Sequence, residues 1–418
     1  MKKIPVTIPY FTEDEENAVK KVLQSGWVAQ GPVVAEFEDA IANYEGVKYG
    51  VATTSCTTSL HLAMVTSGIE RGMDVFAPAF TFVATVNTIV ESGATPVLID
   101  VSQNTYNIDT NKIIEKIRSN YKEKQGKLIN KETGNVLWGI VPVHQFGLCC
   151  DILEINHIAK EYDLKIIEDA ACALGARIGK VHEGGFGNTS CISFHPRKSI
   201  TTGEGGMVLT NDESLAKKMR ELRSHGSSVS ADARHAGKGF LLPEFNDAGY
   251  NYRMTDIQAA VGLAQIKKLD YILEAKRKRS KLYDSLIKEN LPELITPYVP
   301  ENYYHTYQSY VCMLDYKVLG LNSVDEGGEY RNILLSELED IGIATRQGTH
   351  AVHTLGYYKN RFGYKPDELP NAYACDRLSI TLPLYVQMTD EDQEYVVKMI
   401  RNIIDKMRQG SIYGDNCK

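Results

Sequence analysis

The order of apolar segments constrains the fold of this chain most strongly. In the first two-thirds, short apolar runs alternate with stretches whose apolar residues recur every three to four positions. This alternation is typical of strand–helix–strand units that build a largely parallel sheet covered by helices. The sequence therefore predicts an α/β fold. The expected strands are 75–80, 95–101, 139–146, 164–170 and 190–195, and the expected helices between them are 59–69, 85–93 and 152–162.

The last third follows a different pattern. Residues 254–289 are expected to form one long helix or two joined helices, which would bridge to a second domain beginning near residue 270. We therefore predict a large domain over 1–270 and a smaller α+β domain over 271–418. The elements expected in the second domain are a strand at 309–316 and helices near 329–341 and at 390–408.

One segment of the first domain lacks both patterns. Residues 114–135 are charged and have almost no apolar period. A segment of this kind is typical of an exposed connection, so we expect a surface excursion between a helix and the next strand.

Composition excludes several classes of protein. The 418 residues include 46 basic and 53 acidic side chains, a net charge of −7, and no dense basic run, so nucleic acid is not an expected partner. No stretch of about 18 apolar residues is present to span a membrane, and the N-terminus turns acidic before a signal-peptide core forms. We expect a soluble cytoplasmic protein whose 8 cysteines are free thiols. The adjacent Cys149 and Cys150 are expected to be buried thiols rather than zinc ligands.

The segment 193–212 is the most informative one for chemistry. It sets Lys198 just after a predicted strand and just before a glycine-rich turn. A lysine in a loop is most often a solvated surface charge, and the glycines at 184–187 and 203–206 match no nucleotide-binding fingerprint in its required context. The interpretation of Lys198 therefore depends on the residues that accompany it.

Asp169 is the first of these residues. It ends an apolar run 29 positions before Lys198, at the edge where open α/β sheets bind ligands. Pyridoxal phosphate (PLP) needs a lysine amine for its covalent attachment and a carboxylate that keeps its ring nitrogen protonated. The alternative for Asp169 is a helix N-cap at a strand-to-helix turn.

Two further segments can complete such a site. Hydroxyl residues crowd 53–64 before an amphipathic helix, where a helix N-terminus can bind a phosphate, although a capping cluster explains the same residues. In 78–85, Phe80 or Phe82 can stack on a planar cofactor, or both can simply be core.

These segments together resemble a known family, the fold type I PLP-dependent nucleotide-sugar aminotransferases of the DegT/StrS type. The resemblance extends over most of the chain, and its motifs occur in the order found in the family. They are GWVAQGPVVAEFE (26–38), SCTTSLH (55–61), PAFTFVATVN (78–87), VPVHQFG (141–147), EDAACALGA (168–176), SFHPRKSITTGEGG (193–206) and GYNYRMTDIQAA (249–260).

The resemblance implies a role for each matching residue. Lys198 would hold PLP and move the proton at the substrate carbon, and Asp169 would pair with the ring nitrogen. Cys172 stands where relatives usually have Gln or His near the phenolic oxygen, and its thiol is a weaker donor. The remaining cofactor residues implied are Ser193, Cys56 (Gly or Ala in most relatives) with the backbone of Thr57 and Thr58 at the phosphate, and Phe82 stacked on the pyridine ring.

The resemblance also implies a homodimer with shared active sites. A polar residue of segment 249–260 would reach the partner's phosphate, with Asn251 as first choice and Arg253 as second. Capping and packing at the start of the bridging helix is the alternative for both residues.

Lys198 also separates two reactions of this scaffold. A sugar 3-dehydratase of the same family has His at the lysine position, so Lys198 favours transamination. The implied reaction moves an amino group from an amino acid, by resemblance L-glutamate, to a keto group of a nucleotide-linked 4-keto- or 3-keto-6-deoxy sugar. We expect the pKa of the lysine to be lowered by burial and neighbouring positive charge.

Substrate selection is expected partly in residues 342–358, which align with a segment lining the sugar pocket in relatives. The spacing of the two histidines there, without a third ligand, argues against a metal, and we predict none. The tyrosines between 303 and 310 are interpreted only as core and surface residues. The residues predicted to contact substrate are Trp27, His195, Arg346, His350 and His353.

Two alternatives to this function remain open at the sequence level. One is amination of a non-sugar cyclic ketone on the same fold. The other is a non-catalytic regulatory protein that keeps the PLP scaffold, against which the presence of both Lys198 and Asp169 argues.

Overall fold

A nine-stranded sheet forms the centre of the molecule in the computed structural model, which describes residues 3–228 and 242–410. Its main path runs through β1 (Tyr49–Thr53), β12 (Gly206–Thr210), β11 (Thr189–Ser193), β8 (Lys165–Asp169), β7 (Val136–Ile140), β2 (Met73–Pro78) and β4 (Thr95–Ile99). Every neighbouring pair from β11 to β4 is parallel, whereas β12 runs antiparallel to both β1 and β11. The predicted α/β fold with a mostly parallel sheet is confirmed.

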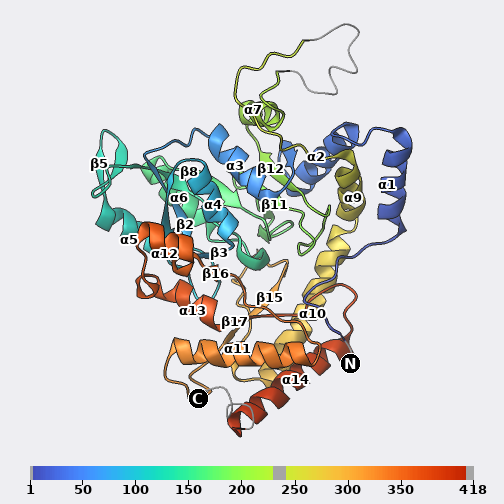
Figure 1. The fold of residues 1–418 in the computed structure, drawn as a ribbon, viewed down its shortest axis with the longest axis vertical. Coiled ribbons are helices and arrows are strands. Elements are labelled where there is room, and N and C mark those ends of the chain that lie inside the picture. The colour runs from blue at the N-terminus through green and yellow to red at the C-terminus, as the bar shows by residue number, and fades with distance from the viewer. Residues whose placement is uncertain (1–2, 229–241, 411–418) are drawn as a thin grey trace.

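Helices follow the strands of this sheet in the predicted order (Figure 1). Each predicted helix is present within a few residues of its expected bounds. The predicted strand 139–146 ends early, at Ile140, and Phe146 has a left-handed φ of 55°. Pro142 in this stretch lacks the amide hydrogen that a continuing strand needs. The helices of the large-sheet region after the first two are α3 (Cys56–Thr66), α4 (Val83–Glu91), α5 (Thr110–Asn120), α6 (Ile152–Tyr162) and α7 (Glu213–Arg223).

The segment 114–135 is more regular than its sequence predicts. It contains the end of α5 and a hairpin of β5 (Tyr121–Lys124) and β6 (Lys127–Asn130), and β6 adds to the sheet beside β7. Ile113, Ile117 and Tyr121 are buried in one apolar cluster. Their spacing of four residues supplies an apolar period that begins before the charged segment. The predicted surface excursion lies between α5 and β7, as expected, but it contains a regular hairpin that the sequence did not indicate.

Two consecutive helices, α9 (Asp256–Ile266) and α10 (Leu269–Asn290), bridge the upper and lower parts of Figure 1. Below the large sheet, α10 packs against α14 (Asp390–Arg408), which in turn contacts α11 (Val324–Asp340). These helices accompany an antiparallel sheet of β13 (Leu294–Ile295), β15 (Tyr310–Leu314) and β17 (Ser379–Leu382). The strand and both helices predicted for this region are confirmed.

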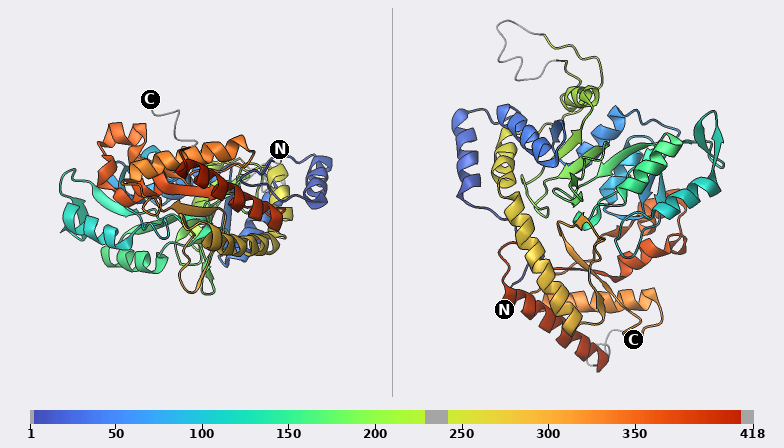
Figure 2. Two further views of the ribbon diagram at one scale, coloured as in Figure 1. Left: turned by 90° about the horizontal axis from the view of Figure 1, so that it is seen from below. Right: turned by 180° about the vertical axis from the view of Figure 1, so that it is seen from behind.

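The first described residues also belong to the lower part. The amide of Ile4 donates to the carbonyl of Gly342 at 2.8 Å, and the amide of Leu384 donates to the carbonyl of Val6 at 2.9 Å. The chain then reaches α1 (Glu13–Ser25) and α2 (Pro32–Glu45), which lie beside α9 at one edge of the molecule (Figure 2). The domain boundary near residue 270 stays a prediction.

Short elements connect the two parts. The pair β3 (Phe80–Thr81) and β16 (His350–Ala351) joins the large sheet's region to the segment 342–358. The guanidinium carbons of Arg177 and Arg277 each lie 4.0 Å from the centroid of the Tyr304 ring. Tyr304 therefore makes cation–π contacts with both arginines in addition to its packing. The other short elements are β9 (Arg177–Ile178), β10 (Val181–His182), β14 (Tyr303–Tyr304), α12 (Gly356–Phe362), α13 (Pro370–Leu378) and the 3-10 turns Gln145–Gly147, Val352–Thr354 and Pro366–Glu368.

Three observations concern the described residues as a set. None of their helices is long and apolar enough to cross a membrane. No group of three or more His, Cys, Asp or Glu side chains among them is arranged to hold a metal ion. Their seven cysteines are free thiols, and Cys417 lies outside the described residues.

Candidate active site

Lys198 lies at the tip of a tight loop between β11 and β12. The base of the loop is closed at Phe194, whose carbonyl accepts hydrogen bonds from the Thr201 hydroxyl (2.8 Å) and the Thr202 amide (3.0 Å). The Lys198 amide donates to the carbonyl of His195 at 2.8 Å, which forms a turn. From the lower part of the molecule, the Gln308 side chain donates to the carbonyl of Arg197 at 2.6 Å. The backbone that carries the lysine is therefore held from both sides.

Asp169 ends β8, and its carboxylate is almost fully buried, with 4% of the residue exposed. One oxygen accepts a hydrogen bond from the Thr85 hydroxyl (2.7 Å) and the other from the Ala171 amide (3.0 Å). Turns rather than a helix follow the strand, so Asp169 is not a helix N-cap. Burial raises the pKa of Asp169, and the hydrogen bonds from Thr85 and Ala171 and the positive charge of Lys198 oppose that rise.

The Lys198 amine donates to the sulfur of Cys172 at 3.0 Å. Burial lowers the pKa of Lys198, whereas Cys172, Cys56 and Asp169 raise it, and in the cofactor-free chain the pKa of the lysine is raised. The predicted lowering concerns the lysine of the PLP-loaded site and stays a prediction. Cys172 is the one cysteine among those described that is not fully buried.

The start of α3 lies at the same edge of the sheet. Ser55 caps the helix: its hydroxyl accepts from the Thr58 amide (3.2 Å), and the Thr58 hydroxyl accepts from the Ser55 amide (3.1 Å). The predicted alternative of a hydroxyl capping cluster is thus present. The amides of Cys56 and Thr57 belong to the first turn, where an α-helix offers no internal acceptor. A Cβ at Gly206 would overlap the Ser55 carbonyl, so only glycine lets β12 pass under this helix start.

Three other predicted cofactor residues surround these groups. Ser193 ends β11 and accepts a hydrogen bond from the His195 amide at 3.3 Å. Phe82 precedes α4 and leaves 62% of its surface exposed, whereas Phe80 is buried in the core. Asn251 is exposed, and the neighbouring Tyr252 carbonyl accepts the Thr54 amide at 3.0 Å. This contact brings the segment around Asn251 beside the start of α3.

A cavity of about 70 Å³ lies between the lysine loop and the lower part of the molecule. Arg197, Gln308, Arg346 and Gln347 are among the side chains that line it. Arg346 is half-exposed, its guanidinium donates to the Thr345 carbonyl at 2.8 Å, and it lies 3.5 Å from Glu339. Cationic and amide groups of this kind suit an anionic or hydroxyl-rich ligand.

The other predicted substrate residues lie in different surroundings. His350 pairs with Thr81 across β16 and β3, and its ring contacts the Gln347 amide nitrogen at 2.8 Å. His195 stands in the lysine loop, where its ring nitrogen accepts from the Arg197 amide at 3.2 Å. His353 is fully buried, with one ring nitrogen 3.3 Å from the Pro366 carbonyl, so it has no surface to offer a ligand. Trp27 donates to the Gln30 carbonyl at 3.1 Å between α1 and α2.

The structure also brings forward residues that the sequence did not indicate. Thr85 anchors Asp169, Gln308 holds the lysine loop, and the buried Lys276 donates to the Gln308 carbonyl at 2.8 Å. Thr85 had one signal, a hydroxyl in the first turn of a mostly apolar helix. Gln308 and Lys276 had none, because Gln308 lies more than a hundred residues from the Arg197 carbonyl that it binds, and Lys276 acts through Gln308.

These residues fit the predicted cofactor. A lysine amine lies in the loop after β11, and a buried carboxylate with two hydrogen bonds ends the adjacent parallel strand β8. Beside them lie the first-turn amides of α3, Gly206, which permits close approach of the backbone, and the exposed ring of Phe82. An amine, a ring-nitrogen partner, a phosphate site and a stacking ring are the four contacts that PLP requires.

Comparisons with known proteins place the whole chain among related sequences and structures. The model of the DegT/DnrJ/EryC1/StrS aminotransferase family matches residues 9–401. The chain is 35% identical to the spore coat polysaccharide biosynthesis protein SpsC of Bacillus subtilis (96% of this chain, 97% of the relative). It is 33% identical to GDP-perosamine synthase of Caulobacter vibrioides (96% and 98%). The structure of Spr1654 from Streptococcus pneumoniae in its PMP form superposes with a TM-score of 0.85 at 25% identity (98% and 100%).

Proposed function

The chain belongs to the DegT/DnrJ/EryC1/StrS aminotransferase family, and on that premise we propose that it aminates a nucleotide-linked deoxy-keto sugar. It is a PLP-dependent aminotransferase. We propose L-glutamate as the amino donor and a keto group of the sugar as the acceptor. A relative whose name specifies a GDP-linked amino sugar supports the nucleotide sugar as substrate class.

One observation carries the proposal: Lys198, in the loop after β11, and Asp169, at the end of the adjacent parallel strand β8, lie close enough to influence each other's pKa. The Lys198 amine is held by Cys172 at 3.0 Å, and the Asp169 carboxylate is held by Thr85 at 2.7 Å. Two groups with separate anchors keep their separation when a ligand enters between them. This pair matches the chemistry of PLP, which when bound acts as an electron sink and carries the amino group between two substrates.

We assign the following work to the chain's own residues. The Lys198 amine would accept a proton from the donor's α-carbon in the first half-reaction and would donate a proton to the acceptor carbon in the second. Asp169 presents its negative charge to the ring nitrogen, and Thr85 keeps that carboxylate in place. The first-turn amides of Cys56 and Thr57 would bind the phosphate, whereas the Thr58 amide, which was also predicted to do so, donates to the Ser55 hydroxyl. Phe82 would cover one face of the pyridine ring, and Cys172 would lie near the phenolic oxygen.

The substrate contacts of the proposal lie around the 70 Å³ cavity. Arg346 and His350 are the groups proposed to bind a phosphate or hydroxyl of the sugar nucleotide, since Arg346 lines the cavity and the His350 ring contacts Gln347, which also lines it. We further propose a cytoplasmic homodimer in which Asn251 reaches the partner's phosphate site. The exposure of Asn251 beside Thr54 supports this arrangement.

The test is a single-turnover amination. Purified protein is loaded with PMP, the free donor is removed, and nucleotide-linked 4-keto- and 3-keto-6-deoxy sugars are added separately. Mass spectrometry should detect replacement of the keto oxygen by an amino group in a nucleotide sugar, with loss of PMP. A small cyclic ketone without a nucleotide serves as the competing substrate. Turnover of that ketone, with none of the nucleotide sugars, would reject the proposed substrate class.

A further inference from the structure

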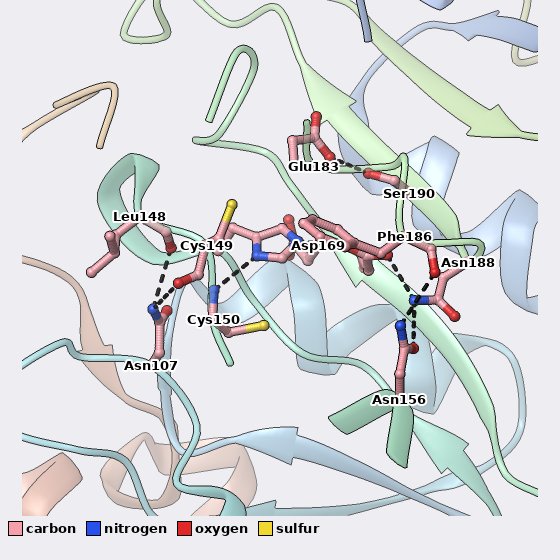
Figure 3. Close-up of polar contacts among 12 residues, drawn as sticks. Asn107, Leu148, Cys149, Cys150, Asn156, Asp169, Glu183, Phe186, Asn188 and Ser190 are labelled. Atoms are coloured by element: carbon pink, nitrogen blue, oxygen red, sulfur yellow. Dashed lines mark hydrogen bonds and ion pairs between the residues drawn. The ribbon is translucent and has the colours of Figure 1, made fainter. Parts of the chain in front are cut away.

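A buried polar network lies behind Asp169 and converges on His144, a residue without an assigned role. His144 sits in the loop after β7, and that loop is held in place by Asn107. The Gln145 amide donates to the Asn107 side-chain oxygen at 2.9 Å. The Asn107 side-chain nitrogen donates to the carbonyls of Leu148 and Cys149, each at 3.2 Å, as Figure 3 shows. These contacts fix the loop from within the protein.

The two ring nitrogens of His144 have different partners. The Cys150 amide lies 3.0 Å from Nδ1 and donates to it. An amide donor at Nδ1 leaves the ring proton on Nε2, which lies 2.7 Å from a carboxylate oxygen of Glu168. Neither side chain of this pair is exposed to solvent. The loop therefore fixes the tautomer of His144 and directs its one N–H to Glu168.

Glu168 and Asp169 are neighbours in β8, so their side chains point to opposite faces of the sheet. The second oxygen of Glu168 accepts a hydrogen bond from the Asn188 side chain at 2.9 Å. Asn188 is also bonded to Asn156 at 2.9 Å (Figure 3). The carboxylate of Glu168 is thus hydrogen-bonded at both oxygens, as a buried charge requires.

The backbone links this network to Asp169. The His144 amide donates to the Asp169 carbonyl at 3.0 Å, and the Asp169 amide donates to the Pro142 carbonyl at 2.8 Å. His144 therefore binds both residues of the strand end: its backbone binds Asp169, and its ring binds Glu168. A shift of the His144 loop must move the strand end that carries the Asp169 carboxylate.

Opposing effects act on the pKa of His144 beside Glu168. Burial lowers the pKa of His144, but Glu168, with smaller contributions from Glu183 and Asp169, offsets burial, and the pKa of His144 is raised. The Cys150 amide at Nδ1 favours the neutral ring, because an imidazolium would turn a proton toward that amide. In both protonation states Nε2 carries a proton, so the ring donates to the Glu168 carboxylate.

We propose that His144 and Glu168 are positioning residues that hold the end of β8 so that Asp169 keeps its direction toward the cofactor's ring nitrogen. This inference rests on the role proposed above for Asp169. It differs from a purely structural role because it requires cofactor binding and the cofactor's spectrum, rather than folding alone, to respond when the pair is broken.

Two variants of His144 separate its two contacts. His144→Asn keeps an acceptor near the position of Nδ1 but cannot reach Glu168, whereas His144→Gln can extend an amide donor to Glu168. Glu168→Gln removes the charge at nearly constant shape. The matched control is Glu183→Gln, because Glu183 is equally buried and bonded to Ser190 at 2.6 Å rather than to the end of β8 (Figure 3).

Three quantities are measured for each variant: the dissociation constant of PLP by absorbance titration, the pH midpoint of the bound cofactor's absorbance, and the melting temperature of the cofactor-free chain. Asp169→Asn is the reference. His144→Asn and Glu168→Gln should each raise the dissociation constant by about tenfold, the size of effect typical when a partner of a liganding group is removed. Both should shift the pH midpoint in the same direction as Asp169→Asn. His144→Gln should lie closer to wild type, and Glu183→Gln should match it.

Different failures have different meanings. If His144→Asn and Glu168→Gln lower the melting temperature but leave the dissociation constant and pH midpoint unchanged, while Asp169→Asn changes both, the positioning role is wrong and Asp169 keeps its own. If Asp169→Asn also leaves the spectrum unchanged, the proposed role of Asp169 fails first. Equal effects in Glu183→Gln would likewise overturn the inference, since they would show a general response to buried substitution.

Discussion

The cofactor edge and the segment 342–358 differ in how firmly their polar groups are held. At the cofactor edge, meaning the ends of β8 and β11 with the start of α3, the Lys198 amine and the Asp169 carboxylate each have defined side-chain partners. In the segment 342–358, Arg346 is half-exposed and bound to a neighbouring carbonyl and a surface carboxylate. Cofactor chemistry needs one fixed geometry, whereas substrate selection tolerates variation, and the two regions are built accordingly.

The largest effect is expected at Lys198. Lys198→Ala removes the amine that attaches the cofactor and moves the proton, so the amination rate should fall by about 10³-fold or more. The absorbance of lysine-bound cofactor should disappear as well. Single-turnover kinetics and an absorbance spectrum check both. Lys180→Ala, a substitution of an exposed lysine, is the control. Near wild-type turnover in Lys198→Ala would contradict the assignment of the cofactor edge as the catalytic region.

A smaller effect is expected at Asp169. Asp169→Asn keeps the size of the side chain but removes its charge, so the rate should fall by about 10²-fold because the ring nitrogen loses its anionic partner. Thr85→Val, which removes one hydrogen bond to that carboxylate, should cost about tenfold. Both rates are measured under saturating substrate. A larger loss in Thr85→Val than in Asp169→Asn would contradict the assignment of Thr85 as a support.

Lys276 tests how tightly the cofactor edge is enclosed. Burial lowers the pKa of Lys276 to about 7, with a further lowering by Lys198 and an opposing effect of Cys172. Between pH 7 and 10.5 the unfolded chain carries this proton and the folded chain does not. The free energy of unfolding should therefore rise with pH across this window, by at most about 1.4 kcal/mol per pH unit.

Denaturant unfolding of the cofactor-free protein across this pH range measures the effect. In Lys276→Met the contribution should vanish, so the variant's stability curve should be flatter than that of wild type. Lys278→Met, at a position on the same helix, serves as the control. Parallel curves for wild type and Lys276→Met would show that the amine is solvated and that the lower side of the lysine loop is open.

The smallest effect is expected in the segment 342–358. Arg346→Gln removes a charge that is half-exposed and screened by solvent, so the KM for the nucleotide sugar should rise by about fivefold while kcat stays nearly constant. Steady-state kinetics with the sugar varied and the donor fixed measure both constants. If kcat fell instead, Arg346 would contribute to the chemical step, like the groups of the cofactor edge, and not only to substrate binding.

The same contrast explains how much the sequence could predict. Most strand positions along the chain, the loop that carries Lys198 and the place of Asp169 at a strand end were predictable, because each depends on residues that are contiguous in the sequence. Thr85 was missed because a hydroxyl in the first turn of a helix resembles an ordinary capping residue. Gln308 and Lys276 were missed because their contacts form only when the lower part of the molecule folds against the lysine loop.

Local patterns also failed where burial decided the outcome. His353 shares the polar character of His350, but the chain buries it against Pro366. The hairpin in 121–130 depends on the pairing of β6 with β7. The charged residues of this segment give no sign of that pairing in the sequence. The direction of the Lys198 pKa in the cofactor-free chain likewise could not be predicted, because it depends on burial and on Cys172, Cys56 and Asp169, which the fold brings to the amine from two different segments.

The central claim is that Lys198 and Asp169 form a working transamination site. Its most direct test is the absorbance spectrum of PLP-loaded wild-type protein before and after addition of L-glutamate. The band of the lysine-bound cofactor should decrease and that of PMP should appear, with 2-oxoglutarate released in equal amount, and Lys198→Ala should show neither change. A wild-type spectrum that remains unchanged with glutamate and with every other amino donor would contradict the claim.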